Sequence, residues 1–447
     1  MKTITVPSEK VPVIEETDIC VVGGSCTGVF AAVRAARLGA NVVIVEKQNR
    51  FGGVATSSLV NMWHSIYDTD YNEQIIGGLT AEIMERLSKR DAVAPFKNSK
   101  DYGIPVNSEE LTIELDELVL EAKIKPCLHS FFSAPVTENG RVTAVIIQNK
   151  SGRGAIKARM FIDATGDADL CHLAGLPTYT PDHIQPPTTC AKFTGWHFPE
   201  GVDPYKLIME HAGEYKLPEG ILWGTFIPPH TDVYMLNGTR VTGRNPANAE
   251  DLTYCEIEGR RQVRAITDIF RKNLNGKCPQ LTALPSYIGI RETRHVKALY
   301  QVKGDDLLHG KKFDDAIANG TYPVDIHHQE KPGITFKRLD GRQTYHRPGK
   351  PGVESRWRKD CGNSPKYYQI PLRSLIPQNA KNAIAAGRML DAEKEAFGGI
   401  RVMVNLNQTG EAAGVAAWHA LATGIEITQV NPRDVRKTLA AGGSCVL

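Results

Sequence analysis

Several features that mark common classes of protein are absent from this sequence. Its 447 residues include nine cysteines, and no two of them stand in a C-x-x-C pair. An odd number of scattered thiols argues against structural zinc and against a cysteine-ligated iron–sulfur cluster. The pattern favours reduced thiols, as in a cytoplasmic protein, and we expect no metal site.

Charge and hydrophobicity exclude further classes. The chain has 53 Lys and Arg against 50 Asp and Glu, and no basic block stands out. We therefore expect neither nucleic acid nor a membrane surface as a partner. No apolar run approaches a transmembrane span, the opening stretch MKTITVPSEKVPVIEE is too polar for a signal peptide, and the final SCVL has serine where a prenylated cysteine would stand. A small-molecule substrate is the expected partner, and the oligomeric state, a homo-oligomer included, stays open.

The first motif that is present lies in residues 18–32, DICVVGGSCTGVFAA. A buried-strand run over 19–22 ends in two glycines, helical periodicity follows over 29–38, and a second strand over 41–45 closes at Glu46. This β-α-β unit is a variant of the dinucleotide fingerprint G-x-G-x-x-G with Ser25 at the second glycine. The helix N-terminus would bind a pyrophosphate, and Glu46 would accept hydrogen bonds from an unphosphorylated ribose diol.

Three later stretches favour FAD over a nicotinamide cofactor. The pair Gly52-Gly53 follows Glu46 closely, as is usual in FAD enzymes, although alone it would also fit a surface turn. Residues 158–170, ARMFIDATGDADL, follow a predicted β-meander and run from a strand into Ala-Thr-Gly-Asp. Residues 382–421 predict a strand, a loop with two glycines and a long alanine-rich helix. A second Gly-rich β-α-β unit is missing, so we expect no NAD(P)H domain.

Together these segments resemble the two-dinucleotide-domain flavoproteins related to glutathione reductase and to the fumarate reductase flavoprotein, and above all the broad FAD-dependent oxidoreductase family. The matching motifs are the N-terminal glycine pairs followed by A-T, the central I-D-A-T-G-D, and a C-terminal A-G-R…G-x-x-R-V-M…G-x-A-A-G. The stretches IGIRETRHV, YPVDIH and YQIPLRSLIP also match. The resemblance covers nearly the whole chain.

The resemblance implies an α/β fold with a Rossmann-like FAD-binding domain, made of a parallel sheet plus a β-meander. This domain would be assembled from residues 1–180 and 370–447, with an inserted α+β substrate domain at 181–369. The residue pattern agrees, because 178–250 and 300–365 look like antiparallel strands and loops, and 251–272 reads as an amphipathic helix.

The candidate FAD-binding residues lie in the glycine-rich turns, after the second strand, and around the C-terminal helix. They are Gly23, Gly24, Ser25, Cys26, Thr27, Gly28, Glu46, Lys47, Gly52, Gly53, Val54, Ala55, Ala164, Thr165, Gly166, Asp167, Gly387, Arg388, Gly399, Arg401, Asn405 and Asn407. We expect the helix that starts near Asn405 or Asn407 to direct its positive end at the flavin ring, although an asparagine there is also a common N-cap.

The candidate catalytic residues are His64, His327, Arg291 and Arg294. His64 could act as a general base, or could simply pack beside Trp63. The two arginines could clamp a carboxylate or a polyol edge, or could form a structural cluster with an adjacent glutamate. The resemblance implies that His327 or its neighbour His328 faces the pocket, and we expect all four candidates to meet between the two domains.

The predicted function is that of an FAD-dependent oxidoreductase that transfers a hydride between a small polar substrate and flavin N5. The substrate would be an alcohol, sugar, polyol or organic acid. Two alternatives stay open: a redox-neutral FAD enzyme of the hydratase or isomerase type, and a flavoprotein subunit or RNA-partner protein that serves a partner's chemistry.

Overall fold

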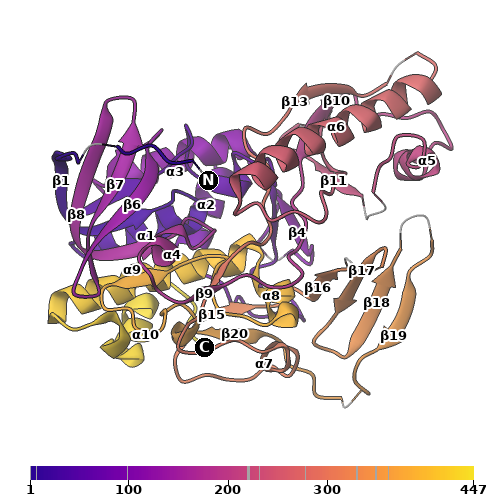
Figure 1. The fold of residues 1–447 in the computed structure, drawn as a ribbon. Coiled ribbons are helices and arrows are strands. Elements are labelled where there is room, and N and C mark those ends of the chain that lie inside the picture. Colours follow the sequence, from indigo (N-terminus) through magenta and orange to yellow (C-terminus); the bar gives the residue numbers. More distant parts are fainter. Residues whose placement is uncertain are drawn as a thin grey trace.

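The computed structural model describes all residues except 1, 7, 98, 219–221, 231, 277, 329–330, 348–349 and 361 (Figure 1). Its strands are β1 (Val13–Val22), β2 (Val42–Val45), β3 (Met62–His64), β4 (Gly103–Pro105), β5 (Lys125–Cys127), β6 (Phe131–Glu138), β7 (Arg141–Asn149), β8 (Gly152–Asp163), β9 (Thr178–Tyr179), β10 (Cys190–Thr194), β11 (Trp223–Phe226), β12 (Val233–Asn237), β13 (Gln280–Ala283), β14 (His295–Val296), β15 (Ala316–Gly320), β16 (Val324–His327), β17 (Ile334–Lys337), β18 (Arg342–His346), β19 (Val353–Arg356), β20 (Tyr368–Pro371) and β21 (Ala383–Ala385). The α-helices are α1 (Cys26–Arg37), α2 (Gly78–Ser88), α3 (Ser108–Glu121), α4 (Asp169–Leu173), α5 (Pro204–His211), α6 (Ala249–Asn273), α7 (Gly304–Leu308), α8 (Lys394–Ile400), α9 (Met403–Thr423) and α10 (Pro432–Ala441).

The largest sheet has the strand order β5-β2-β1-β8-β7-β6, and β21 also pairs with β8. The β1–β2, β2–β5, β1–β8 and β8–β21 pairs are parallel, whereas β6, β7 and β8 form an antiparallel meander. Parallel strands joined through a crossover helix with both faces covered are the mark of a doubly wound α/β domain. The predicted Rossmann-like α/β fold with its β-meander is therefore confirmed.

Helix α1 follows β1 directly and packs against α9. The Ser25 hydroxyl caps α1 by accepting a hydrogen bond from the N–H of Gly28 at 3.3 Å. Two glycines of α9 permit the close approach, since a Cβ on Gly410 or Gly414 would lie 2.1 Å from the Thr27 carbonyl oxygen or 2.3 Å from that of Ala31. The C-terminal helix thus completes the layer that the N-terminal β-α-β unit begins.

The middle of the chain forms smaller antiparallel sheets. One has the order β11-β12-β10-β13 and packs on the long helix α6, whose buried residues share a core with Phe193 and Trp196 (Figure 1). Another, β16-β17-β18-β19, forms the arm that Figure 1 shows on the right. Strand β15 pairs with β20. Buried residues of this region belong to the same core cluster as residues of β1 and α1, among them Val302, Ile317 and Ile326. The division at residues 180 and 370 stays a prediction.

Two local expectations differ from the structure. The glycines Gly398 and Gly399, predicted in a loop, lie in the short helix α8. Helix α9 begins at Met403, before both asparagines proposed as its start. The helix predicted over 251–272 is present as α6. Within the described residues, none of the helices is both long enough and apolar enough to cross a membrane.

Candidate active site

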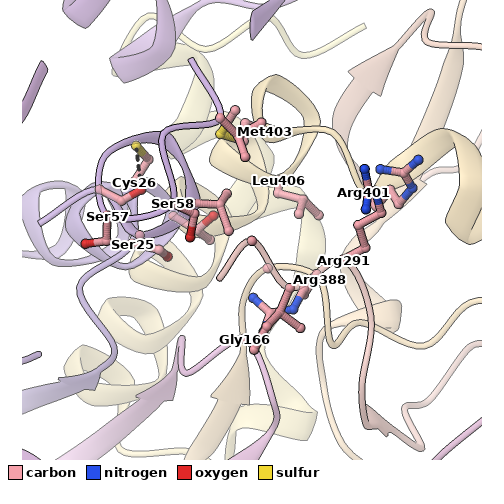
Figure 2. Close-up of a pocket in the computed structure, with 18 of the residues that line it drawn as sticks. Ser25, Cys26, Ser57, Ser58, Gly166, Arg291, Arg388, Arg401, Met403 and Leu406 are labelled. Carbon is pink, nitrogen blue, oxygen red and sulfur yellow. Dashed lines mark hydrogen bonds between the residues drawn. The ribbon is translucent and has the colours of Figure 1, made fainter. Parts of the chain in front are cut away.

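A cavity of ≈ 520 Å³ runs from the turn after β1 to the inner strand of the β16–β19 arm. Its lining comes from stretches that are far apart in the chain: the β1–α1 turn, the end of β2, the glycine pair, the β8 end, the loops before β14 and β16, and the start of α9. Figure 2 shows Ser25, Ser57 and Ser58 on one side of it and Arg291 with Arg401 on the other. The two ends of the cavity differ in the side chains that line them.

The first end is built by close backbone approaches. Gly23 has φ +110°, and a Cβ there would lie 2.2 Å from the carbonyl oxygen of Ala164. A Cβ on Gly28 would lie 1.9 Å from the carbonyl oxygen of Gly23. The turn therefore requires glycine at both positions, and it leaves the N-terminus of α1 beside the cavity, where free N–H groups favour an anion.

Acidic and basic side chains complete this end. Glu46 accepts hydrogen bonds from the N–H groups of Gly24 at 2.6 Å and Gln48 at 2.8 Å. Burial raises the pKa of Glu46, although these N–H groups oppose the effect. Nearby, Arg388 donates to Asp167 at 2.6 Å, and burial, which would raise the pKa of Asp167, is outweighed by Arg388 and by Lys47.

Several buried polar atoms beside the cavity have no hydrogen-bond partner among the described residues. They are the hydroxyls of Ser57 and Ser58 and both side-chain amide atoms of Asn407. Buried polar groups are rarely left unpaired in proteins, because each costs about 1–3 kcal/mol. Together with the glycine turn and Glu46, these donors and acceptors fit a dinucleotide with a hydroxylated chain.

The first turn of α9 also faces the cavity, through Met403, Leu406 and Asn407. Its N-cap, Val402, has no side-chain hydrogen bond to the helix, so the first N–H groups are free to bind a ligand. Asn405 points elsewhere: its Nδ2 donates to the Tyr368 hydroxyl at 3.0 Å and to the Gly399 carbonyl at 3.1 Å. The structure thus gives the two predicted asparagines different surroundings.

The second end centres on the carboxylate of Asp325. Its Oδ2 accepts from the Tyr322 hydroxyl at 3.0 Å and from Nη2 of Arg401 at 2.6 Å, and its Oδ1 lies 3.4 Å from Nε2 of His327. Burial alone would raise the pKa of Asp325, but His327 and Arg401 outweigh it and hold the pKa below its usual range. Nδ1 of His327 lies 3.2 Å from Nη2 of Arg240. This carboxylate is ionised at neutral pH.

His64 lies beside this group, between two tyrosine rings. Its ring centroid is 4.5 Å from that of Tyr322 and 5.3 Å from that of Tyr102. Its Nδ1 is buried and has no hydrogen-bond partner in the described part of the chain. Burial and, to a smaller extent, Arg401 lower the pKa of His64 to about 3, against the opposing effect of Asp325. The imidazole is therefore neutral at neutral pH and can accept a proton.

Arg291 extends into the cavity from the segment between β13 and β14 (Figure 2). Its Nη1 donates to the carbonyl of Pro186 at 2.5 Å. Burial lowers the pKa of Arg291 to about 9, and the positive charges of Arg401 and Arg240 contribute. The guanidinium groups of this end are thus close enough to influence one another.

Most predicted site residues line the cavity. Those that do are His64, Arg291, His327, Gly23, Ser25, Cys26, Thr27, Glu46, Lys47, Gly52, Gly53, Val54, Ala164, Thr165, Gly166, Asp167, Gly387, Arg388, Arg401 and Asn407. The others, Arg294, Gly24, Gly28, Ala55, Gly399 and Asn405, fall outside the described lining. Arg294 is instead held by the Asp167 carbonyl at 2.9 Å and the Asp169 carboxylate at 3.1 Å. Arg294 thus contacts two lining residues of the first end without lining the cavity itself, and its catalytic role stays a prediction.

Sequence reasoning missed several lining residues. Ser57 and Ser58 stand four and five residues after Gly53, and two hydroxyls so close to the glycine pair were an available signal. Tyr322 lies in the YPVDIH stretch, but Arg240 and Tyr102 belong to no recognisable motif. Among the described residues, no group of three or more His, Cys, Asp or Glu side chains is placed to hold a metal ion.

Comparison with known proteins places this chain in a family. The sequence profile described as FAD dependent oxidoreductase matches residues 18–439. Digeranylgeranylglycerophospholipid reductase 1 of Methanopyrus kandleri is 27% identical over 217 residues, which are 46% of this chain and 54% of that protein. Mitochondrial dihydrolipoyl dehydrogenase of Schizosaccharomyces pombe is 28% identical over 107 residues, 21% of each chain. The chain thus spans about half of the first curated relative and about a fifth of the second.

Among solved structures, a geranylgeranyl bacteriochlorophyll reductase-like protein of Thermoplasma acidophilum is similar with a TM-score of 0.49 and 13% identity, over 96% of this chain and 83% of that one. The profile match covers nearly the whole sequence, and the cavity has the glycine turn, the acidic residue and the unpaired polar atoms that a flavin dinucleotide needs. The chain belongs to the FAD-dependent oxidoreductases, a family of enzymes whose cofactor is FAD.

Proposed function

We propose that this enzyme transfers a hydride between a C–H bond of a small polar substrate, an alcohol or an organic acid, and FAD. The observation that carries the proposal is the neutral imidazole of His64 at the polar end of the cavity, with its Nδ1 unpaired. Removal of a hydroxyl proton during oxidation needs such an acceptor.

The residues at the first end would hold the cofactor. The β1–α1 turn with the N-terminus of α1 would bind its pyrophosphate, and Glu46 would bind the adenosine ribose. Ser57, Ser58 and Asn407 would pair with the remaining polar groups, since their buried atoms have no described partner. When bound, FAD supplies the hydride acceptor of the reaction.

His64 serves this role better than His327, the other candidate base. Arginine can only donate hydrogen bonds, so Nδ1 of His327 accepts from Arg240 and the ring proton resides on Nε2, facing Asp325. His327 therefore has both ring nitrogens engaged and would lose a contact on accepting a proton. We assign it a positioning role for Asp325, and we assign the proton transfer to His64.

The substrate would differ from the one in the name of the Methanopyrus relative. A long apolar lipid chain would place hydrocarbon against Arg291 and exclude water from its guanidinium, whose described hydrogen bond goes to a neutral carbonyl. A small molecule with its own polar groups suits this end of the cavity better.

Anaerobic mixing of the FAD-loaded enzyme with a panel of alcohols, polyols and organic acids tests the proposal. A substrate of the proposed kind bleaches the flavin absorbance in a single turnover. Turnover of a panel member without any net flavin reduction would contradict hydride transfer and favour a redox-neutral reaction of the hydratase or isomerase type. Bleaching only by compounds without a hydroxyl group would remove the role of His64 as base and favour CH–CH dehydrogenation.

A further inference from the structure

Three arginine side chains, Arg240, Arg291 and Arg401, line the second end of the cavity, where Asp325 is also a lining residue. Arg401 is already paired, because its Nη2 lies 2.6 Å from Asp325. Asp325 also accepts from the Tyr322 hydroxyl through Oδ2, and its Oδ1 lies 3.4 Å from Nε2 of His327. Nη2 of Arg240 lies 3.2 Å from Nδ1 of His327, whereas the described hydrogen bond of Arg291 goes to a backbone carbonyl.

Arg291 forms no ion pair with any described residue. Its one described hydrogen bond is from Nη1 to the Pro186 carbonyl, a neutral acceptor at 2.5 Å. That contact fixes one edge of the planar guanidinium and leaves Nη2 and Nε for another partner. A guanidinium in this setting is oriented for a ligand, and Asp325 acts on its charge without forming an ion pair with it.

The pKa values of Arg291 and His64 also indicate an excess of positive charge at this end of the cavity. Burial lowers the pKa of Arg291 to about 9, and the nearby Arg401 contributes. Burial also lowers the pKa of His64 to about 3, again with a contribution from Arg401. A bound anion at this position would offset the positive charge and bring the pKa of His64 back toward the range in which a general base is effective.

We propose that the substrate carries one carboxylate group and that Arg291 binds it, with Arg401 on the other side of the same subsite. The inference rests on the proposed function and names its substrate class. It also moves Arg401 from the predicted cofactor residues to the substrate site, and it replaces Arg294, which the structure ties to Asp167 and Asp169.

A carboxylate fits the subsite better than the alternatives. The planar guanidinium fork matches its two oxygens and can bind them with two parallel hydrogen bonds. A polyol offers only neutral oxygens and would leave the buried charge of Arg291 uncompensated. Arg401 is matched with Asp325, and a carboxylate on the substrate would offset the charge of Arg291. The lining also contains the apolar residues Trp223, Ile334 and Phe336, which favour a hydrocarbon group on the substrate.

The test is direct binding to the oxidised FAD-loaded enzyme, measured by calorimetry. The probes are a series of 2-hydroxy acids with short, branched and phenyl side chains, each matched with the 1,2-diol in which CH₂OH replaces the carboxylate. At least one acid is expected to bind about tenfold or more tightly than its diol, a difference of ~1.4 kcal/mol. No variant is needed for this comparison, so it holds even where a substituted protein fails to fold.

Variants then locate the subsite. Arg291→Gln is expected to remove the preference for the acid over the diol, and Arg291→Lys to keep part of it, because the charge remains but the fork is lost. Arg294→Gln, three residues further along and outside the described lining, is the matched control and is expected to keep the full preference. The FAD content of each variant is measured first, so that loss of the cofactor is not read as loss of the subsite.

The outcomes separate this inference from the proposed function. If no acid binds more tightly than its diol, or if Arg291→Gln keeps the preference, the carboxylate subsite is wrong. If acids bind through Arg291 but none bleaches the flavin anaerobically, the subsite stands and the oxidation proposal fails. If diols bleach the flavin while acids neither bind nor bleach, the oxidation proposal stands and the carboxylate subsite fails.

Discussion

The Nη2 atom of Arg401 lies 2.6 Å from Oδ2 of Asp325, and this ion pair links the end of α8 to strand β16 at the cavity. The same carboxylate also meets the Tyr322 hydroxyl and the His327 ring. Three groups thus meet one buried charge, two from the same YPVDIH stretch and one, Arg401, from a distant part of the sequence. The orientation of the whole polar end depends on Asp325, although we give the direct chemistry to His64.

We expect Asp325→Asn to destabilise the protein by on the order of 3–5 kcal/mol, because it leaves the partly buried Arg401 without its counter-charge. Asp340→Asn is the matched control, since Asp340 is a partly exposed carboxylate that pairs with Arg342 at 2.6 Å near the surface. The control is expected to cost no more than about 1 kcal/mol. Urea unfolding of both variants gives the comparison. Equal and small losses would mean that the Asp325 cluster contributes little to stability.

His64→Gln is expected to slow flavin reduction by the true substrate about 10²–10⁴-fold, the usual contribution of a positioned general base. FAD content is expected to stay the same, because His64 is assigned to the substrate end of the cavity. The matched control is His328→Gln, the neighbour of His327, whose Nε2 lies 2.7 Å from the Thr335 hydroxyl outside the described lining. Stopped-flow measurement at saturating substrate checks the rate. Wild-type reduction rates in His64→Gln would assign the proton transfer to another group.

The stability of the protein is expected to fall with acidification between pH 6.5 and about 4. Burial lowers the pKa of His64 and of His327 to about 3 in the folded protein, whereas an unfolded histidine titrates near ~6.5. In this window the unfolded chain binds protons that the folded protein does not, so stability is present above the window and lost as pH falls. Each such group contributes a slope of about 1.4 kcal/mol per pH unit.

His64→Gln isolates this contribution, because glutamine does not titrate. The difference in unfolding free energy between wild type and variant is expected to change across pH 4.5–6 by about 1.4 kcal/mol per unit. Buried carboxyl groups such as Glu46, whose pKa is raised by burial, change the stability with pH in the opposite direction. Both proteins contain them, so their contribution cancels when the difference is taken. A difference that stays constant with pH would show that His64 titrates in the folded protein as it does in the unfolded chain.

Gly28→Val is expected to abolish FAD retention. A Cβ at this position would lie 1.9 Å from the Gly23 carbonyl oxygen, so the turn and the start of α1 must separate. Gly213→Ala is the control, because no atom lies within 4 Å of a Cβ built there and its φ is ordinary. The flavin absorbance of each purified protein, relative to its protein absorbance, gives the result. Full flavin occupancy in Gly28→Val would place the pyrophosphate elsewhere.

The N-terminal half of the cofactor site could be predicted from the sequence because its parts are close together in the chain. Gly23, Ser25, Gly28 and Glu46 belong to one β-α-β unit, whose strand and helix periods determine where each residue stands. The same holds for the β-meander, whose turns at Asn139-Gly140 and Gly152 have positive φ angles. Local backbone preferences suffice for such units.

The polar end of the cavity was decided by the tertiary structure. Arg291 and Arg294 lie in an irregular segment without a repeating period, so the sequence could not indicate which of them faces the cavity. Successive side chains along a strand point to opposite faces, so His327 at the end of β16 and the following His328 are not expected to face the cavity together. Only the packing of the β16–β19 arm determines that His327 lines it.

Helix α8 shows the same limit for backbone structure. Two adjacent glycines favour a loop by propensity, yet Gly398 lies in a helix. Its lack of a Cβ lets this helix approach β16, since a Cβ there would lie 2.8 Å from the Asp325 carbonyl oxygen. That close helix–strand approach places Arg401 against Asp325. The sequence by itself determined the dinucleotide unit, through short-range periodicity and steric demands. Long-range packing alone decided which charged side chains meet, because nothing local in the chain encodes a contact between residues 76 positions apart.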